Sequence, residues 1–367
     1  RDYKVTGVQT CALPISAWGD DHGLGAAPTK GSPRGHPDSA DAPHPLREDD
    51  SMSATGGAEI AAEHTPVVDV TAWAVIRDEP GGRDPNKRWL AADPEAPRHE
   101  HWLWKSRQRT GDGSETALTD CAEVIVSRLA SLIDLPAAVC QFAVCDGEWG
   151  VISRNVTPDG FSLNTGATYL PEVEGYERQW ADSTKELRPG RMRRERGYTL
   201  DAVRQVLTNV GAPSGTSGLS AFGVFAGYLV LDALTGNTDR HPGNWALLES
   251  DEDGTRYLAA TYDHGSALGA GLTEENRMTR RPKDFAAKGR ANPFEPKGQP
   301  LVDLAFDAVA QADADLWLSR LAILDKGTVR AALDAPPGRL SEVAAMFIEG
   351  VILENRRRLS DDHVTED

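Results

Sequence analysis

The stretch GNTDRHPGNWALL, residues 236–248, decides the fold expected of this 367-residue chain. It follows Leu219–Leu234, a run that is apolar on nearly all sides and predicts a buried helix ending at Gly236. Two β-like segments come next, WALLES at 245–250 and TRYLAATY at 255–262, with the turn sequence DEDG between them. The sequence therefore predicts a buried helix, a polar loop and a hairpin in succession.

The predicted hairpin brings three polar side chains toward one spot. Asn244 precedes the first strand and Asp263 follows the second, and the turn at Asp253 and Gly254 lies midway between them. An antiparallel hairpin centred there places both side chains at its open end. Asp239, five residues before Asn244, lies on the loop that leads to the same place.

Carboxylate and carboxamide groups gathered beside such a loop suit magnesium, which proteins hold by one or two ligands plus phosphates. Phosphoryl transfer also needs a group that orients or deprotonates the attacking hydroxyl. An Asp followed five positions later by Asn has the spacing of a kinase catalytic loop, and Asp263 stands where the second metal ligand belongs. We therefore assign Asp239 to the attacking hydroxyl, as base or orienter, Asn244 and Asp263 as ligands of Mg²⁺, and ATP as cofactor.

The same residues have simpler interpretations when each is taken alone. Asp, Asn, Gly and Pro are ordinary turn formers, so the assignment depends on the combination. His241 and His264 raise the possibility of zinc, but neither has a spaced set of partner ligands. We interpret His241 as a packing and orienting residue of the catalytic loop.

The residues before position 166 predict a small antiparallel sheet with one helix. Strand-like stretches are VVDVTAWAVI at 67–76, HWLWK at 101–105, and AAVCQFAVCD and WGVISRNV on either side of the Asp146-Gly147 turn signal. A helix is expected from residue 115 to Pro136, since apolar residues recur at spacings of four and three: Leu118, Ala122, Ile125, Leu129 and Leu132.

This first lobe supplies candidate nucleotide-binding groups. Lys105 closes the strand WLWK, and Glu123 lies 18 residues further on, in the predicted helix. Kinases pair such a lysine with such a glutamate so that the ammonium reaches the ATP phosphates. Glu115 is the alternative partner. Gly81 and Gly82, in EPGGRDPNKRW, are the candidates for a turn whose N–H groups face the phosphates, although the sequence is not GxGxxG.

The expected fold class is α+β, a bilobal protein-kinase-like fold with a small antiparallel-sheet N-lobe carrying one helix and a mainly helical C-lobe. The N-lobe is predicted over residues 52–165 and the C-lobe, with the catalytic loop, over residues 166–367. Residues 1–51 are expected to be disordered and outside the fold, because VTGVQTCALPI at 5–15 resembles a translated sequencing adapter and the rest lacks hydrophobic periodicity.

Charge and hydropathy exclude several classes of function. A net charge of -17 argues against tight binding to a nucleic-acid backbone. No run reaches the ~18 to 20 apolar residues of a membrane span, so a cytoplasmic location is the expectation. The four cysteines have no paired metal-type spacing and are expected to be reduced thiols.

With these residues assigned, the chain resembles the HipA family of bacterial serine/threonine kinases, in particular the HipA-like C-terminal domain, across roughly residues 67 to 358. The resemblance is carried by KRWL, WLWK, AEVIVSRLASLIDLP, GVISR, LTGNTDRHPGN and TYDHGSALG. It implies a bilobal kinase with ATP between the lobes, Lys105 on the nucleotide phosphates, Asp239 as base, and Asn244 with Asp263 on magnesium.

The resemblance has limits. The phosphate loop of the family's toxins carries an autophosphorylated serine, whereas EPGGRDPNKRW has no Ser or Thr. Met52 is the first methionine and the expected start of the natural protein, and the toxins' extra N-terminal subdomain has little room after it. Self-inactivation and an antitoxin partner are therefore left open. A protein Ser/Thr substrate is the leading expectation; a lipid or small-molecule kinase and a non-catalytic nucleotide-binding regulatory module are the alternatives.

Overall fold

The computed structural model describes residues 65–77, 87–178, 195–216 and 218–361. Its strands are β1 (Val68–Asp69), β2 (Ala74–Arg77), β3 (Lys87–Ala91), β4 (Trp102–Ser106), β5 (Cys140–Cys145), β6 (Glu148–Arg154), β7 (Phe161–Thr165), β8 (Glu177–Arg178), β9 (Glu195–Arg196), β10 (Ala246–Ser250) and β11 (Arg256–Leu258). Its helices are α1 (Thr119–Leu132), α2 (Gly166–Tyr169), α3 (Leu200–Val206), α4 (Ala221–Thr235), α5 (Glu274–Thr279), α6 (Pro282–Ala286), α7 (Leu301–Ala312), α8 (Leu316–Arg320), α9 (Lys326–Ala332) and α10 (Glu342–Asp361), with short 3-10 turns at Arg98–Glu100, Leu170–Glu172 and Leu321–Ile323.

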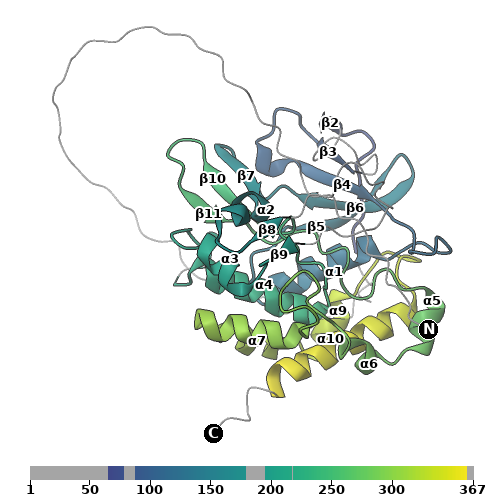
Figure 1. Ribbon diagram of the computed structural model, residues 1–367. Coiled ribbons are helices and arrows are strands. Elements are labelled where there is room, and N and C mark those ends of the chain that lie inside the picture. The colour runs from purple at the N-terminus through teal and green to yellow at the C-terminus, as the bar shows by residue number, and fades with distance from the viewer. Residues whose placement is uncertain (1–64, 78–86, 179–194, 217, 362–367) are drawn as a thin grey trace, which may run out of the picture. The chain divides into compact units, whose positions relative to one another are not determined.

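The first lobe is a six-stranded sheet in the order β1-β5-β6-β4-β3-β2 (Figure 1). Four of its strand pairs are antiparallel, as expected, but β1 pairs with β5 in parallel. The purely antiparallel sheet of the prediction was thus wrong at this edge. Parallel neighbours need a long connection, and the intervening strands and α1 provide it.

The two faces of this sheet have different partners, because successive side chains of a strand point to opposite sides. Trp104, Leu90 and Ile152 pack with one another on one face in a small apolar cluster. The other face carries Lys87 and Lys105, which lie directly opposite each other on β3 and β4. The lysines therefore share the face that also holds Val151, the neighbour of Lys105 on β6.

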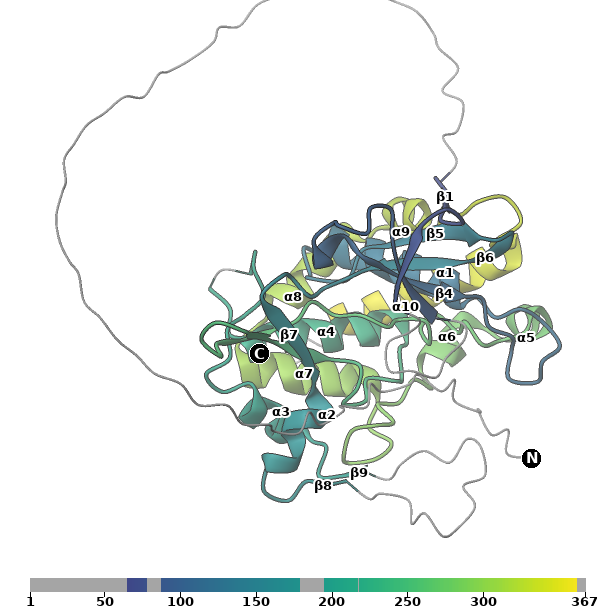
Figure 2. The ribbon, with the colours of Figure 1, turned by 90° about the horizontal axis from the view of Figure 1, so that it is seen from above.

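Helix α1 is the predicted N-lobe helix, and its apolar side is buried as the spacing indicated. It packs against β5 and β6 and also against α4 and α9. It ends at Leu132, four residues before Pro136, because the chain turns at Asp134, whose φ of 51° lies in the left-handed region. Figure 2 shows α1 beneath the strands of the six-stranded sheet.

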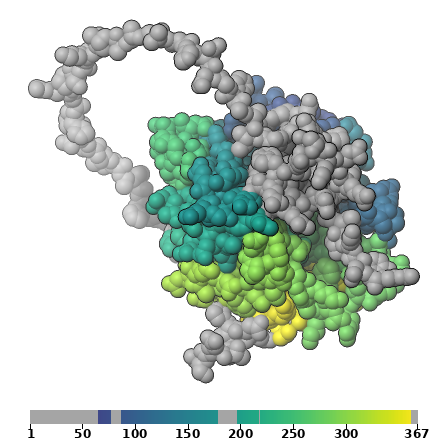
Figure 3. Space-filling model, in the orientation of Figure 1, coloured from purple at the N-terminus to yellow at the C-terminus, as the bar shows by residue number. Residues whose placement is uncertain are grey.

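The second lobe is built around α4, every residue of which is buried. The Ser220 hydroxyl accepts from the Gly223 N–H at its start, and Gly236, with φ of 66°, ends it as predicted. Gly227 is required, since a Cβ there would lie 2.6 Å from Trp317. Helices α7, α8 and α10 pack on α4, and residues of the C-terminal third form the lower part of the face in Figure 3.

The hairpin after the catalytic loop exists, with a shifted register. Leu247 pairs with Leu258, so Asn244 lies nearer to the level of Thr261 than of Asp263. The shift arises because the Gly254 N–H bonds to the Ser250 carbonyl, which closes the turn earlier than the midpoint estimate assumed. The hairpin register alone therefore does not set Asn244 opposite Asp263, and the two segments are linked by the Tyr262 hydroxyl, which donates to the Gly243 carbonyl.

Strand β7 pairs with β10 and joins the three-stranded sheet β11-β10-β7. The last strand of the six-stranded sheet ends at Arg154, so the pairing of β7 with β10 favours a division between the lobes within 155–160. The expected division after residue 165 stays a prediction. The expected extension 1–51 lies outside the described residues. Across the described residues, no helix combines the length and apolarity needed to cross a membrane.

Candidate active site

Lys105 connects the two lobes at the centre of the candidate site. Its Nζ lies 2.5 Å from Glu123 Oε1 on α1 and 2.8 Å from Asp263 Oδ1, just after β11. The second oxygen of Glu123 accepts the backbone N–H of His264 at 3.0 Å. The predicted lysine–glutamate pair is therefore present, and both of its members also bind the segment that starts at Asp263.

Glu115, the alternative partner of Lys105, is engaged elsewhere: its carboxylate accepts the backbone N–H of Glu274 at 2.8 Å. That contact fixes the start of α5 against the loop before α1. Of the two candidates, Glu123 is thus the one that pairs with Lys105.

The charges of this cluster stabilise one another. Burial alone opposes ionisation of Asp263, but the ammonium groups of Lys105 and Lys87 outweigh burial and hold its pKa below the ordinary value. Burial likewise opposes the charged form of Lys105, and Asp263 and Glu123 outweigh it, so the pKa of Lys105 is raised. Each charge of the pair therefore favours the ionised form of the other.

Hydrogen bonds of side chains shape the loop between α4 and β10. Asn244 Nδ2 donates to the Asp239 carbonyl at 2.7 Å, which leaves Oδ1 as the side-chain atom able to contact a cation. The Asp239 N–H donates to Asn237 Oδ1, and its carboxylate lies 3.5 Å from the Ser266 hydroxyl. The Tyr262 hydroxyl donates to the Gly243 carbonyl at 3.1 Å and so ties this loop to the chain beside Asp263.

The two histidines differ in their contacts with the chain around them. His241 Nδ1 accepts the Gly243 N–H at 3.0 Å, and its backbone N–H donates to the Asp239 carbonyl. His264 is buried, and burial together with nearby Arg240 lowers its pKa, so its ring is neutral. Over the described residues, no group of three or more His, Cys, Asp or Glu side chains forms a metal cluster.

A buried ion pair anchors the catalytic loop to α4. The Arg240 guanidinium donates to both oxygens of Asp232, from Nε at 2.7 Å and from Nη2 at 2.8 Å, while Nη1 donates to the Asn244 carbonyl at 2.5 Å. Sequence reasoning missed this pair. The available signal was the single carboxylate of Asp232 within the apolar helix, eight residues before Arg240, because a buried carboxylate needs a partner.

We expect Arg240→Met to destabilise the protein by about 3–5 kcal/mol, because it leaves the Asp232 carboxylate buried without its cation. For a domain of this size such a loss lowers the melting temperature by roughly 10 °C. Thermal unfolding followed by circular dichroism measures it. Arg281→Met is the matched control: its pair with Asp284 is exposed, so its melting temperature stays near that of the unmodified protein. Equal midpoints for the two variants contradict the anchoring role.

Lys87 is a second residue that sequence reasoning did not assign. It belongs to the KRWL string, is 8% exposed and lies opposite Lys105 across β3 and β4. Its charge contributes to the lowered pKa of Asp263, which places it close to the cluster. Gly81 and Gly82, the candidates for the phosphate turn, lie outside the described residues, which resume at Lys87.

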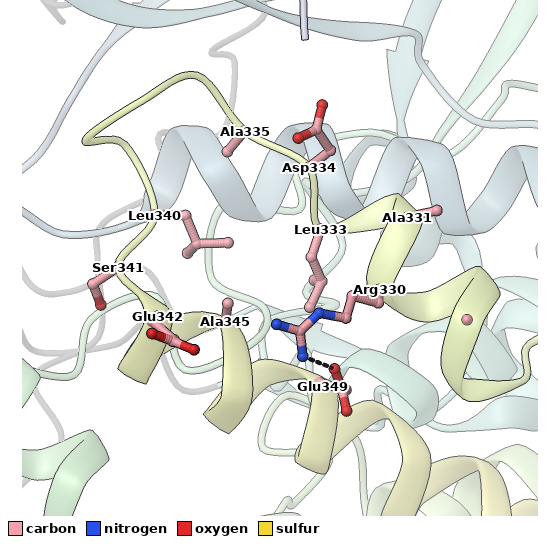
Figure 4. A pocket seen from close by; sticks show the side chains of 11 residues that line it. Arg330, Ala331, Leu333, Asp334, Ala335, Leu340, Ser341, Glu342, Ala345 and Glu349 are labelled. Atoms are coloured by element: carbon pink, nitrogen blue, oxygen red, sulfur yellow. Dashed lines mark hydrogen bonds and ion pairs between the residues drawn. The ribbon is translucent and has the colours of Figure 1, made fainter. Parts of the chain in front are cut away.

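A cavity of about 710 Å³ lies away from this cluster, between α9 and α10. Figure 4 shows Arg330, Leu333, Leu340 and Ala345 around it, with the Arg330–Glu349 ion pair at one side. None of the residues assigned to phosphate transfer lines this cavity. The candidate site is therefore defined by side-chain chemistry and not by cavity size.

The arrangement is that of a kinase-like fold: a sheet-based first lobe, a helical second lobe, and a lysine joined to carboxylates from both. The solved structure of the Helicobacter pylori proinflammatory kinase CtkA is similar, with a TM-score of 0.53 and 16% sequence identity over 82% of this chain and 100% of that chain. At this identity the similarity establishes the fold, and the predicted α+β, bilobal kinase-like architecture is confirmed.

HipA of Shewanella oneidensis MR-1, solved with HipB and its operator DNA, has a TM-score of 0.42 and 13% identity over 72% of this chain and 59% of that chain. No protein-family model matches this chain, and no curated protein sequence matches it. The roles of individual site residues therefore rest on the geometry described above.

Proposed function

We propose that this protein transfers the γ-phosphate of ATP to a Ser or Thr hydroxyl of a protein. The observation that carries the proposal is Lys105, whose ammonium binds Glu123 and Asp263 at once. A lysine held in this way is positioned to contact nucleotide phosphates beside a carboxylate that is ready to bind a metal ion.

The chain's residues divide the work of phosphate transfer. Lys105, oriented by Glu123, neutralises negative charge on the nucleotide, and Lys87 on the next strand adds a second cation on the same face. Asp239 accepts a hydrogen bond from the attacking hydroxyl and takes its proton as general base. His241 holds the loop through its bond with the Gly243 N–H.

Asn244 and Asp263 fit a magnesium site. Both carry oxygen atoms, Asp263 is kept ionised by its lysine neighbours, and two protein ligands plus phosphate oxygens are what Mg²⁺ ordinarily uses. The bound ion supplies positive charge that stabilises the transferring phosphoryl group.

The substrate class is tested by incubating the protein with γ-labelled ATP and Mg²⁺, alone and with a lysate of cells. Label that co-migrates with protein and is recovered as phosphoserine or phosphothreonine supports the proposal. Label recovered in lipid or in small molecules assigns the enzyme to that class of kinase instead. ATP binding without transfer to protein, lipid, small molecule or water favours the regulatory module.

A further inference from the structure

Two ion pairs lie side by side between the end of β4 and the first turns of α1. Lys105 pairs with Glu123, and two residues further along the chain Arg107 Nε donates to Asp120 Oδ1 at 2.8 Å. Residues two apart along an extended strand, and three apart on a helix, point to the same side. The Arg107–Asp120 ion pair therefore lies next to the Lys105–Glu123 ion pair, on the same side of the chain.

A residue of the second lobe also binds Asp120. Arg339, between α9 and α10, donates from Nη2 to Asp120 Oδ2 at 3.0 Å, and its carbonyl accepts from Arg107 Nη2 at 3.2 Å. The Asp120 side chain is 1% exposed. The Arg339 guanidinium lies over the ring of Trp149 on β6, 4.3 Å from its centre. One buried carboxylate thus joins β4, α1 and the α9–α10 segment.

The other end of α1 is also bound to the second lobe. Arg128 Nη1 donates to the Ala332 carbonyl at 3.1 Å, and Arg320 Nη1 donates to the Ile133 carbonyl at 3.1 Å. With that end held, the position of the first turns of α1 depends on contacts at Asp120 and on the Leu118 N–H, which bonds to the Ala270 carbonyl. Those turns carry Glu123.

We propose that Arg107, Asp120 and Arg339 are a positioning triad that holds α1 so that Glu123 pairs with Lys105. Formation of the Lys105–Glu123 ion pair then depends on the segment between α9 and α10, which carries Arg339. The inference rests on the proposed kinase function for its effect on phosphate transfer. Its effect on the Lys105–Glu123 pair is independent of that function. Burial is essential to the triad's role, because exposed ion pairs contribute little.

The test compares Arg339→Met with Glu123→Gln and with the double variant. Met keeps an apolar stem against Trp149 and removes the bonds to Asp120. We expect Arg339→Met to lower kcat/KM for ATP roughly 10-fold, the scale of coupling between residues of one network. If Arg339 acts through Glu123, the double variant loses no more than Glu123→Gln alone. Losses that multiply in the double variant overturn the proposal.

A second measurement does not need phosphate transfer. The acylation rate of Lys105 by a water-soluble amine-reactive ester is followed by mass spectrometry, with exposed Lys283 as internal standard. We expect Lys105 to react several-fold faster in Arg339→Met, because its side chain is 13% exposed beside Glu123 and movement of Glu123 with the first turns of α1 uncovers the nitrogen. Arg330→Met, which breaks the nearby pair with Glu349 instead, is the matched control and leaves the rate unchanged.

Asp120→Asn replaces Arg339→Met in both measurements if the latter does not fold, since Asn keeps the shape and an acceptor oxygen. An unchanged Lys105 rate in a folded triad variant overturns the proposal. A raised acylation rate of Lys105 in a protein that transfers no phosphate supports the triad and contradicts only the proposed kinase function. The two inferences therefore fail separately.

Discussion

Asp239→Asn is expected to reduce phosphate transfer by about 100- to 10,000-fold and to leave ATP binding close to that of the unmodified protein. Asparagine has the same shape as aspartate but cannot accept the proton of the attacking hydroxyl. Two contacts that hold the loop do not involve this carboxylate: Asn244 is held by the carbonyl of residue 239, and Arg240 is held by Asp232.

Two assays on the same preparation separate these effects. Transfer is measured with labelled ATP, and affinity for Mg-ATP is measured by calorimetric titration. Asp253→Asn, in the exposed turn of the hairpin, is the control for a change of one negative charge and retains full transfer. A variant at Asp239 that transfers at the unmodified rate means that this residue is not the base, and the regulatory-module alternative then becomes the better explanation.

Local patterns were enough to predict the elements that carry the site. The apolar spacing of α1 placed Glu123 on a helix, and the WLWK pattern placed Lys105 at the end of a strand. In the structure Lys105 Nζ lies 2.5 Å from Glu123 Oε1. The apolar pattern of residues 300–323 predicts one helix and shows the limit of the same reasoning. Its apolar pattern continues, but Asp313 adopts a left-handed φ of 50° and divides it into α7 and α8.

Residues whose roles depend on distant partners were not predictable in this way. Lys87 reaches the cluster because β3 pairs with β4 in a register that sets it opposite Lys105, and nothing local to KRWL fixes that register. Arg339 is 219 residues from Asp120, so no spacing rule connects them. Burial of a charge is a signal only at Asp232, which stands within the apolar helix α4 and has an arginine partner. Asp120 also has arginine partners, but it lies in the first turn of α1, where an acidic residue is ordinary.

Replacing Asp263 should have a different outcome from replacing Asp239. Asp263 has a φ of 63°, which Asn adopts readily, so Asp263→Asn removes the charge without adding backbone strain. Lys105 then retains Glu123 but loses its second carboxylate, and the magnesium site loses its charged ligand. We expect transfer to fall about 100-fold or more, on the scale of several kcal/mol of lost charge stabilisation, and the magnesium-dependent gain in ATP affinity to shrink with it.

Calorimetric titration of ATP with and without Mg²⁺ measures this gain directly. Asp313→Asn is the matched control, because Asp313 also has a left-handed φ, of 50°, but is exposed at the end of α7. It should keep both the transfer rate and the magnesium effect. If Asp263→Asn binds ATP with the unmodified dependence on Mg²⁺, Asp263 does not hold the metal ion, whatever happens to transfer. The two assigned roles require that Asp263→Asn lose the magnesium-dependent gain in ATP affinity and that Asp239→Asn retain it.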